Sequence, residues 1–89
     1  MAYNNKPEWA TPGVATCVKQ EAMREGNPEE WRDCGVLLEW EYDARLTEMN
    51  QLGLRVFRAR VRWPSGRVDS LLPSMLESFP VELETKHPE

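Results

Sequence analysis

A chain of 89 residues forms one small domain, which leaves little interior for an enclosed active site or a large cofactor cavity. Its hydrophobic share of 40% is too high for a disordered chain, and its net charge of −4 argues against general binding to phosphate backbones. No apolar run approaches the roughly 18 residues of a membrane span, and the polar first six residues do not suit a signal peptide. We therefore expect a folded protein that is not secreted by means of a signal peptide.

The cysteine and histidine content argues against metal and catalytic sites. Cys17 and Cys34 are expected to be reduced thiols packed as small apolar residues, because no export signal accompanies them. The only histidine is His87, whereas structural zinc needs about four Cys or His ligands, so no metal or other cofactor is predicted. The sequence also lacks a phosphate-binding glycine loop and a nucleophile with a histidine base, so we predict no enzymatic activity.

Residues 1–12 are polar and contain two prolines, which predicts an N-terminal arm without regular structure of its own. Trp9 lies inside this arm, where so large an apolar ring is poorly placed in water. It therefore either folds back onto the domain or anchors the arm on a partner. The β-branched residues 13–19 follow and predict a first strand with Val14, Thr16 and Val18 on one face.

A long polar excursion, residues 20–33, comes next. Asn27 suits the cap of a helix and Pro28 suits the first helical position, so the excursion is expected to carry one or two helical turns. Residues 35–43 then alternate and predict a second strand, with Glu39 and Glu41 on one face. The other face holds four apolar residues: Val36, Leu38, Trp40 and Tyr42. A polar connection is expected at 44–51.

Residues 54–63 predict a third strand with a row of arginines on its outward face. The inward face holds Phe57, Ala59, Val61 and Trp63. The segment Pro64-Ser65-Gly66 suits a tight hairpin, because proline presets φ for a turn and glycine accepts a positive φ. A fourth strand at 67–72, a 3₁₀-type turn at 73–77 and a short fifth strand at 79–84 follow, and residues 85–89 form a tail.

This order predicts an all-β domain over residues 13–84. Two long open edges in a small sheet favour edge-to-edge pairing between molecules, so a curled and nearly closed five-stranded barrel is the expected arrangement. The long first loop carries a short helical turn, and a 3₁₀ turn precedes the last strand. The residues outside this domain are the arm at 1–12 and the tail at 85–89.

Three short motifs lie within residues 33–77: GVLLE at 35–39, VRWPSG at 61–66 and LPSMLE at 72–77. In these motifs the chain resembles a family of small bacteriophage-encoded SH3-like proteins. The resemblance implies an SH3-like small barrel in a viral protein. Its motifs consist mostly of turn and core residues, so it implies a fold more than an activity. Polyproline binding is not carried over, because Trp40 and Trp63 fall at inward positions.

Two groups of residues are candidates for binding a partner. Arg58, Arg60 and Arg62 form a row that either makes a salt-bridge ladder with Glu39 and Glu41 or offers a basic stripe to an acidic protein or to nucleic acid. The nucleic-acid alternative lacks exposed aromatic residues for base stacking between the arginines.

The two tryptophans outside the strands are the second group. Trp31 on the excursion is either a lid over the core or an exposed interface anchor, and Trp9 on the arm is the other candidate anchor. No residue is singled out for catalysis, cofactor binding or metal binding.

We therefore predict a non-enzymatic barrel that binds another protein. Under the resemblance it is a small structural or accessory component of a phage virion, such as a tail, baseplate or capsid adaptor, found in the host cytoplasm or the assembled virion. The alternative is a phage inhibitor of a host or defence protein, and a third reading is a nucleic-acid-binding barrel that uses the arginine row. No membrane partner is expected, and assembly into a homo-oligomer stays open.

Overall fold

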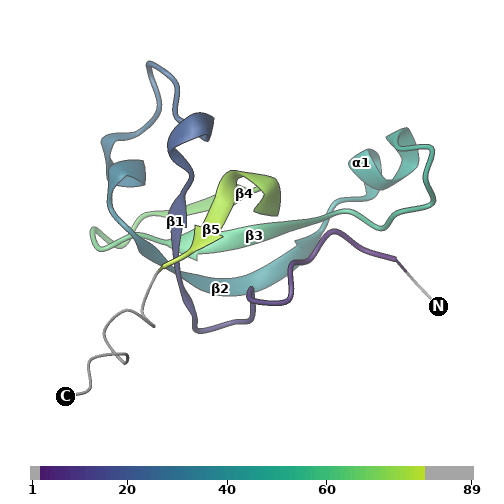
Figure 1. The fold of residues 1–89 in the computed structure, drawn as a ribbon, viewed down its shortest axis with the longest axis horizontal. Coiled ribbons are helices and arrows are strands. Elements are labelled where there is room, and N and C mark those ends of the chain that lie inside the picture. Colours follow the sequence, from purple (N-terminus) through teal and green to yellow (C-terminus); the bar gives the residue numbers. More distant parts are fainter. Residues whose placement is uncertain (1–2, 80–89) are drawn as a thin grey trace.

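The structure, a computed structural model, describes residues 3–79. Its strands are β1 (Ala15–Val18), β2 (Gly35–Tyr42), β3 (Phe57–Arg62), β4 (Val68–Leu71) and β5 (Leu76–Ser78), as Figure 1 shows. The helical elements are α1 (Ala44–Met49) and the 3₁₀ turns η1 (Gln20–Ala22), η2 (Glu29–Arg32) and η3 (Pro73–Met75). The longest of the described helices, α1, has six residues. No helix among the described residues is long and apolar enough to cross a membrane.

All five strands join one antiparallel sheet in the order β4-β3-β2-β1-β5. The predicted all-β class is therefore confirmed, as are the helical turns in the first loop and the 3₁₀ turn before the last strand. The sheet is open and not closed into the expected barrel. Its two edge strands have only four and three residues, so they present short edges that need less protection against pairing with other chains.

A β-bulge divides β2 into two parts with opposite inward residues. Before the bulge Leu37 lies opposite Val61, and after it Trp40 lies opposite Ala59, so one extra residue, Leu38, is inserted between them. The prediction that Val36 and Leu38 face inward was wrong. The extra residue in the bulge shifts the inward positions from odd-numbered residues before it to even-numbered residues after it, whereas the prediction placed even-numbered residues inward throughout. Leu37 is the buried residue of this segment, with 1% of its surface exposed.

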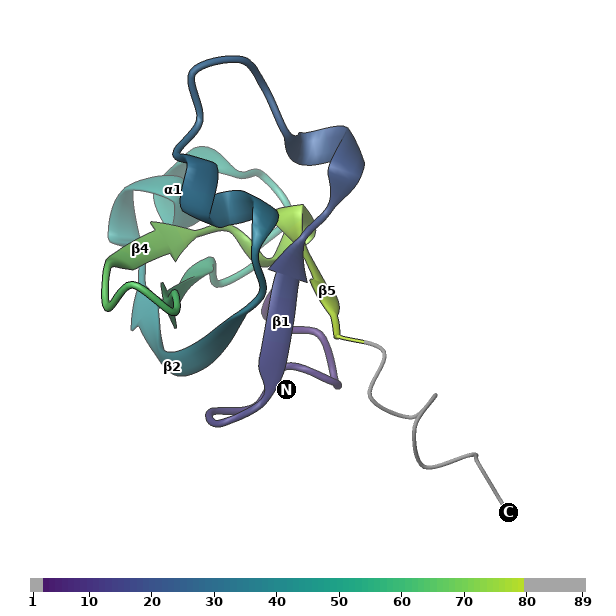
Figure 2. The same ribbon diagram turned by 90° about the vertical axis from the view of Figure 1, so that its left-hand side faces the viewer.

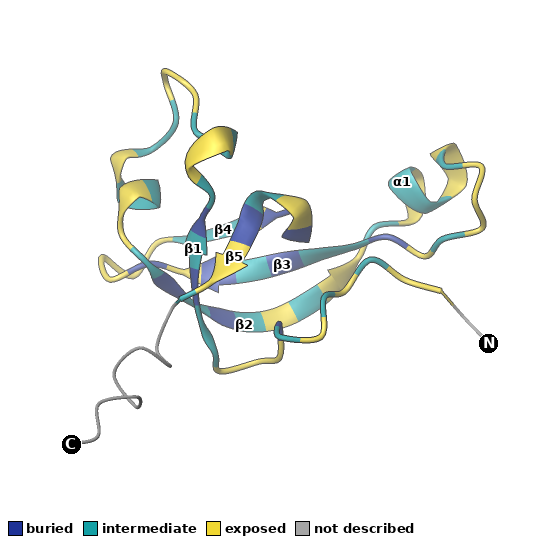
Figure 3. Ribbon diagram, in the orientation of Figure 1, coloured by how far each residue is buried: buried dark blue, intermediate teal, exposed yellow. Residues whose placement is uncertain are grey.

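The inward face of β3 and the residues around it form the centre of the core. Ala59, Val61 and Trp63 are fully buried, which confirms the predicted alternation of this strand. Gly35 lies so close to this layer that a Cβ atom on it would come within 2.6 Å of the Arg62 carbonyl oxygen. In β1 the predicted inward residues Thr16 and Val18 are buried as well. Figure 3 shows this buried band along the sheet and the exposed residues of the loops around it.

Two connections differ from the prediction. Residues 44–49 form α1 and not a polar connection, because Asp43 caps the helix by accepting a hydrogen bond from the Leu46 backbone N–H at 2.9 Å. The last strand is β5, which begins at Leu76 directly after η3 and pairs with β1, so it precedes the expected range of 79–84. Residues 80–84 of that range and the predicted tail at 85–89 lie outside the described residues.

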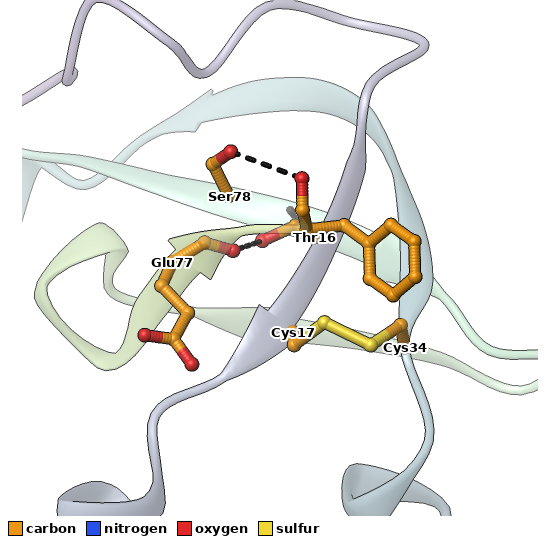
Figure 4. The surroundings of a disulfide bond; sticks show 6 residues. Thr16, Cys17, Cys34, Glu77 and Ser78 are labelled. Atoms are coloured by element: carbon orange, nitrogen blue, oxygen red, sulfur yellow. Dashed lines mark hydrogen bonds between the residues drawn. A yellow bond between two sulfur atoms is a disulfide. The ribbon is translucent and has the colours of Figure 1, made fainter. Parts of the chain in front are cut away.

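Cys17 and Cys34 form a disulfide bond, so the expectation of two reduced thiols was wrong. The antiparallel pairing of Thr16 with Gly35 places the two cysteines directly opposite each other, with their Cα atoms 4.4 Å apart. Figure 4 shows the bond beside Thr16, whose hydroxyl donates a hydrogen bond to the Glu77 carbonyl. The bond closes the base of the excursion, which projects from the sheet in Figures 1 and 2.

Candidate functional site

A groove of about 760 Å³ lies where the N-terminal arm, α1 and η3 meet. This volume falls within the roughly 300–1,000 Å³ of small-ligand pockets. The groove lining comes from four separate parts of the chain: Asn4, Asn5, Lys6, Pro7 and Trp9; Lys19; Leu46, Met49, Asn50 and Val56; and Leu72, Pro73, Ser74 and Leu76. Eight of these 14 residues are apolar, so the groove presents apolar surface to the outside.

The arm is held against the start of β3 by backbone-like hydrogen bonds. The Asn5 side chain donates to the Phe57 carbonyl at 3.0 Å and accepts from the Phe57 N–H at 2.8 Å. The Arg55 N–H donates to the Tyr3 carbonyl at 2.9 Å, and Asn4 forms a parallel bridge with Arg55. Pairing between β3 and β4 begins only at Ala59, so the arm satisfies backbone groups that β4 does not reach.

Aromatic contacts hold the middle of the arm. The Lys6 ammonium lies 4.2 Å from the centre of the Phe57 ring and 5.6 Å from that of Trp40, both within cation–π range. The Trp40 indole N–H donates to the Ala10 carbonyl at 3.3 Å. Trp9 is half-buried and packs against the core, so it folds back onto the domain, and it also lines the groove. The arm is thus a fixed wall of the groove.

The opposite wall is α1, and two polar residues fix its ends. Asp43 caps the first turn and also accepts a hydrogen bond from the Arg58 guanidinium at 2.9 Å. The Leu46 N–H and then the Arg58 side chain hold the pKa of the Asp43 carboxyl below its usual value. At the other end the Asn50 side chain bonds to the backbone of Leu54 through both its oxygen and its nitrogen.

The groove is basic, although the chain as a whole is acidic. Two of its lining residues, Lys6 and Lys19, are cationic, and none of the described lining residues is Asp or Glu. Within residues 3–79 neither lysine forms a salt bridge. An apolar groove whose lysines have no acidic partner among the described residues attracts a ligand that combines apolar and acidic groups.

Exposed apolar side chains surround the same end of the molecule. The large hydrophobic residues that the described part of the chain exposes are Tyr3, Tyr42, Met49 and Leu52. Three of them belong to the stretch from the end of β2 through α1 to the loop after it, and the fourth lies on the arm where it pairs with Arg55. Figure 1 shows the start of the arm and α1 at one end of the sheet. Of these four residues only Met49 also lines the groove.

The arginine row lies on the outer face of β3, as predicted. Arg60 forms a salt bridge with Glu39 at 2.8 Å, across the strand pair. Arg58 bonds to Asp43 and not to Glu41, and Arg62 makes no salt bridge with any residue in the range 3–79. The row is thus partly neutralised by ladder contacts and lies apart from the lining of the groove. A partner-binding role for these arginines stays a prediction.

Trp31 is not part of the groove lining and joins a polar cluster at the β3–β4 hairpin. Its indole N–H donates to Asp69 at 2.9 Å, and the buried Trp63 donates to the same carboxylate oxygen at 2.8 Å. Burial raises the pKa of Asp69, but the hydrogen bonds from Trp31, Trp63 and Arg67 outweigh it and leave the pKa below its usual value. Trp31 is half-buried against the core, which is the lid position, one of the two alternatives that the sequence allowed. Its role as an anchor for a partner stays a prediction.

Of the groove residues, Trp9 was predicted from the sequence as a candidate for binding a partner. The groove itself was not predicted. Its other lining residues are ordinary apolar and polar side chains that only the folded chain brings together. No group of three His, Cys, Asp or Glu side chains in the described range is placed to hold a metal ion. Comparisons with protein-family models, with curated proteins and with solved structures found no match. The resemblance to phage SH3-like proteins therefore stays a prediction.

Proposed function

We propose that this protein is a non-enzymatic binding module that takes up a segment of another protein in the groove between the arm, α1 and η3. The observation that carries the proposal is a preformed, largely apolar groove of about 760 Å³ on a small domain. Its walls are fixed by the Asn5 and Asp43 hydrogen bonds, so little ordering entropy would be lost on binding.

The more specific reading is an SH3-like domain in a small structural or accessory protein of a phage virion. Support for the fold comes from the order of elements along the chain: five short strands, a long first loop with helical turns, and a 3₁₀ turn before β5, the order of elements in SH3-like small barrels. Support for the phage setting comes only from the three sequence motifs. The alternative is an inhibitor of a host or defence protein, which the same groove would serve. Nucleic-acid binding by the arginine row is third.

Affinity capture tests the proposal. The intact protein, Met49→Glu and Leu52→Glu would be immobilised and exposed to lysate of the cells in which the protein is made. Met49 lines the groove, whereas Leu52 is an exposed apolar residue outside it, so the second variant is a matched control. We expect proteins that the intact chain and Leu52→Glu retain and Met49→Glu loses.

The identity of the captured proteins separates the readings. Particle proteins favour a virion component, and a single host enzyme favours the inhibitor. Retention that Arg60→Glu abolishes and Met49→Glu leaves intact would contradict the groove as the binding site.

A further inference from the structure

We infer that the groove selects an extended peptide that combines apolar side chains with at least one acidic side chain, and that Lys19 and Ser74 receive the acidic group. The inference rests on the proposed function and specifies the chemistry of the partner. It is carried by two neighbouring groove residues, Lys19 and Ser74, whose side chains make no hydrogen bond or salt bridge with residues 3–79.

Lys19 and Ser74 are brought together by the sheet. The Lys19 backbone N–H donates to the Met75 carbonyl at 2.8 Å, which places the end of β1 directly beside η3. Both residues line the groove. Neither makes a side-chain hydrogen bond or a salt bridge with any residue between 3 and 79. An ammonium and a hydroxyl donor in this arrangement are suited to a carboxylate.

The other polar residues of the lining make contacts within the protein, and Asn4 accepts a hydrogen bond from the Lys6 backbone N–H at 2.9 Å. Asn5 uses both ends of its amide on Phe57, and Asn50 bonds to Leu46, Thr47 and Leu54. Lys6 lies over two aromatic rings. Of the two cationic lining residues, Lys19 is therefore the one left to receive an acidic group, beside Ser74, while the apolar lining contributes apolar contact.

Because the chain as a whole is acidic, a groove with basic residues is selective for acidic peptides. Acidic residues outnumber basic ones by 15 to 11, yet none of the described groove residues is acidic. A basic peptide would be attracted to the remaining surface and not to the groove. A folded domain would not enter a groove of about 760 Å³, whereas an extended segment can insert a few side chains.

Selection from a display library of random 12-residue peptides tests the inference on the full oxidised chain. We expect the enriched peptides to pair apolar residues with Asp or Glu. Fluorescence anisotropy of one labelled enriched peptide then measures affinity for Lys19→Gln, Lys19→Glu, Ser74→Ala and the control Leu52→Glu. Removing the charge should weaken binding by about 5-fold and reversing it by about 10-fold or more, and Leu52→Glu should bind as the parent does.

The outcomes separate this inference from the proposed function. Peptides that need Met49 but show no acidic preference, and bind Lys19→Glu as tightly as the parent, would overturn the inference alone. No enrichment, or binding that Met49→Glu leaves unchanged, would overturn both. Concentration-dependent dimerisation that Met49→Glu abolishes, seen by sedimentation, would assign the groove to a second copy and also overturn the inference.

Discussion

Replacing Asp69 by alanine tests the polar cluster that joins the excursion to the β3–β4 hairpin. One oxygen of this carboxylate accepts hydrogen bonds from the indoles of Trp31 and Trp63, and the other accepts one from Arg67 at 3.2 Å. Only 1% of the Trp63 surface is exposed, so its N–H would lose its acceptor in a place that water does not reach.

The size of the effect follows from these contacts. A buried donor left without a partner costs about 1–3 kcal/mol, and the half-buried Trp31 would lose a hydrogen bond worth about 0.5–1.5 kcal/mol. The ion pair with the half-exposed Arg67 adds at most about 1 kcal/mol. We therefore expect Asp69→Ala to lower the free energy of unfolding by about 2–4 kcal/mol, a large share of the stability of so small a domain.

Urea unfolding followed by the fluorescence of the four tryptophans measures this loss, with the disulfide kept oxidised. Asp69→Asn retains one side-chain oxygen as an acceptor and should lose only about 1 kcal/mol. Glu39→Gln removes an exposed ion pair with Arg60 and should cost less than about 1 kcal/mol. If Asp69→Ala unfolds within about 0.5 kcal/mol of the parent, the carboxylate does not hold the two indoles and the reasoning fails.

Three further predictions concern stability. Reduction of the disulfide, which links residues 17 positions apart, should lower the free energy of unfolding by about 3 kcal/mol. The control variant Cys17→Ser/Cys34→Ser should not respond to reductant. Equal unfolding midpoints of the parent with and without reductant would contradict this prediction. Gly35→Ala should cost about 1–3 kcal/mol in the same assay, since its Cβ would overlap the Arg62 carbonyl, and an unchanged midpoint would show that the layer relaxes freely. Because its pKa is lowered, ionised Asp69 stabilises the fold at a pH above its unfolded pKa of about 3.9, and this contribution is lost as the pH falls through the folded pKa. Acid should therefore destabilise Asp69→Asn less than it destabilises the parent. Identical acid unfolding transitions of the two proteins would argue against the lowered pKa.

The strands of this protein follow from local sequence because alternation and turn residues are local signals. Phe57 to Trp63 alternate without interruption, and Pro64 and Gly66 mark the hairpin, so the inward face of β3 was predicted correctly. The bulge at Leu38 escaped prediction, because an unbroken apolar alternation gives no sign that the two faces exchange there.

Other features were missed although the sequence held a partial signal. Asp43 before Ala44 is a good helix cap, yet six residues are too few for a clear helical period, so α1 was predicted as a connection. The disulfide follows from the register of β1 and β2, which places Cys17 opposite Cys34. The expectation of reduced thiols did not take this register into account. The groove needs contributions from four distant segments, and no local pattern announces it.

The most direct test of a peptide-binding groove is a two-dimensional ¹H–¹⁵N NMR titration of the full oxidised chain with an enriched acidic peptide. We expect the largest shifts at the backbone amides of Lys19, Met49, Val56 and Ser74, which surround the groove. Shifts confined to Arg58, Arg60 and Arg62, or no shifts at a peptide concentration that saturates the anisotropy signal, would contradict the assignment of the binding site.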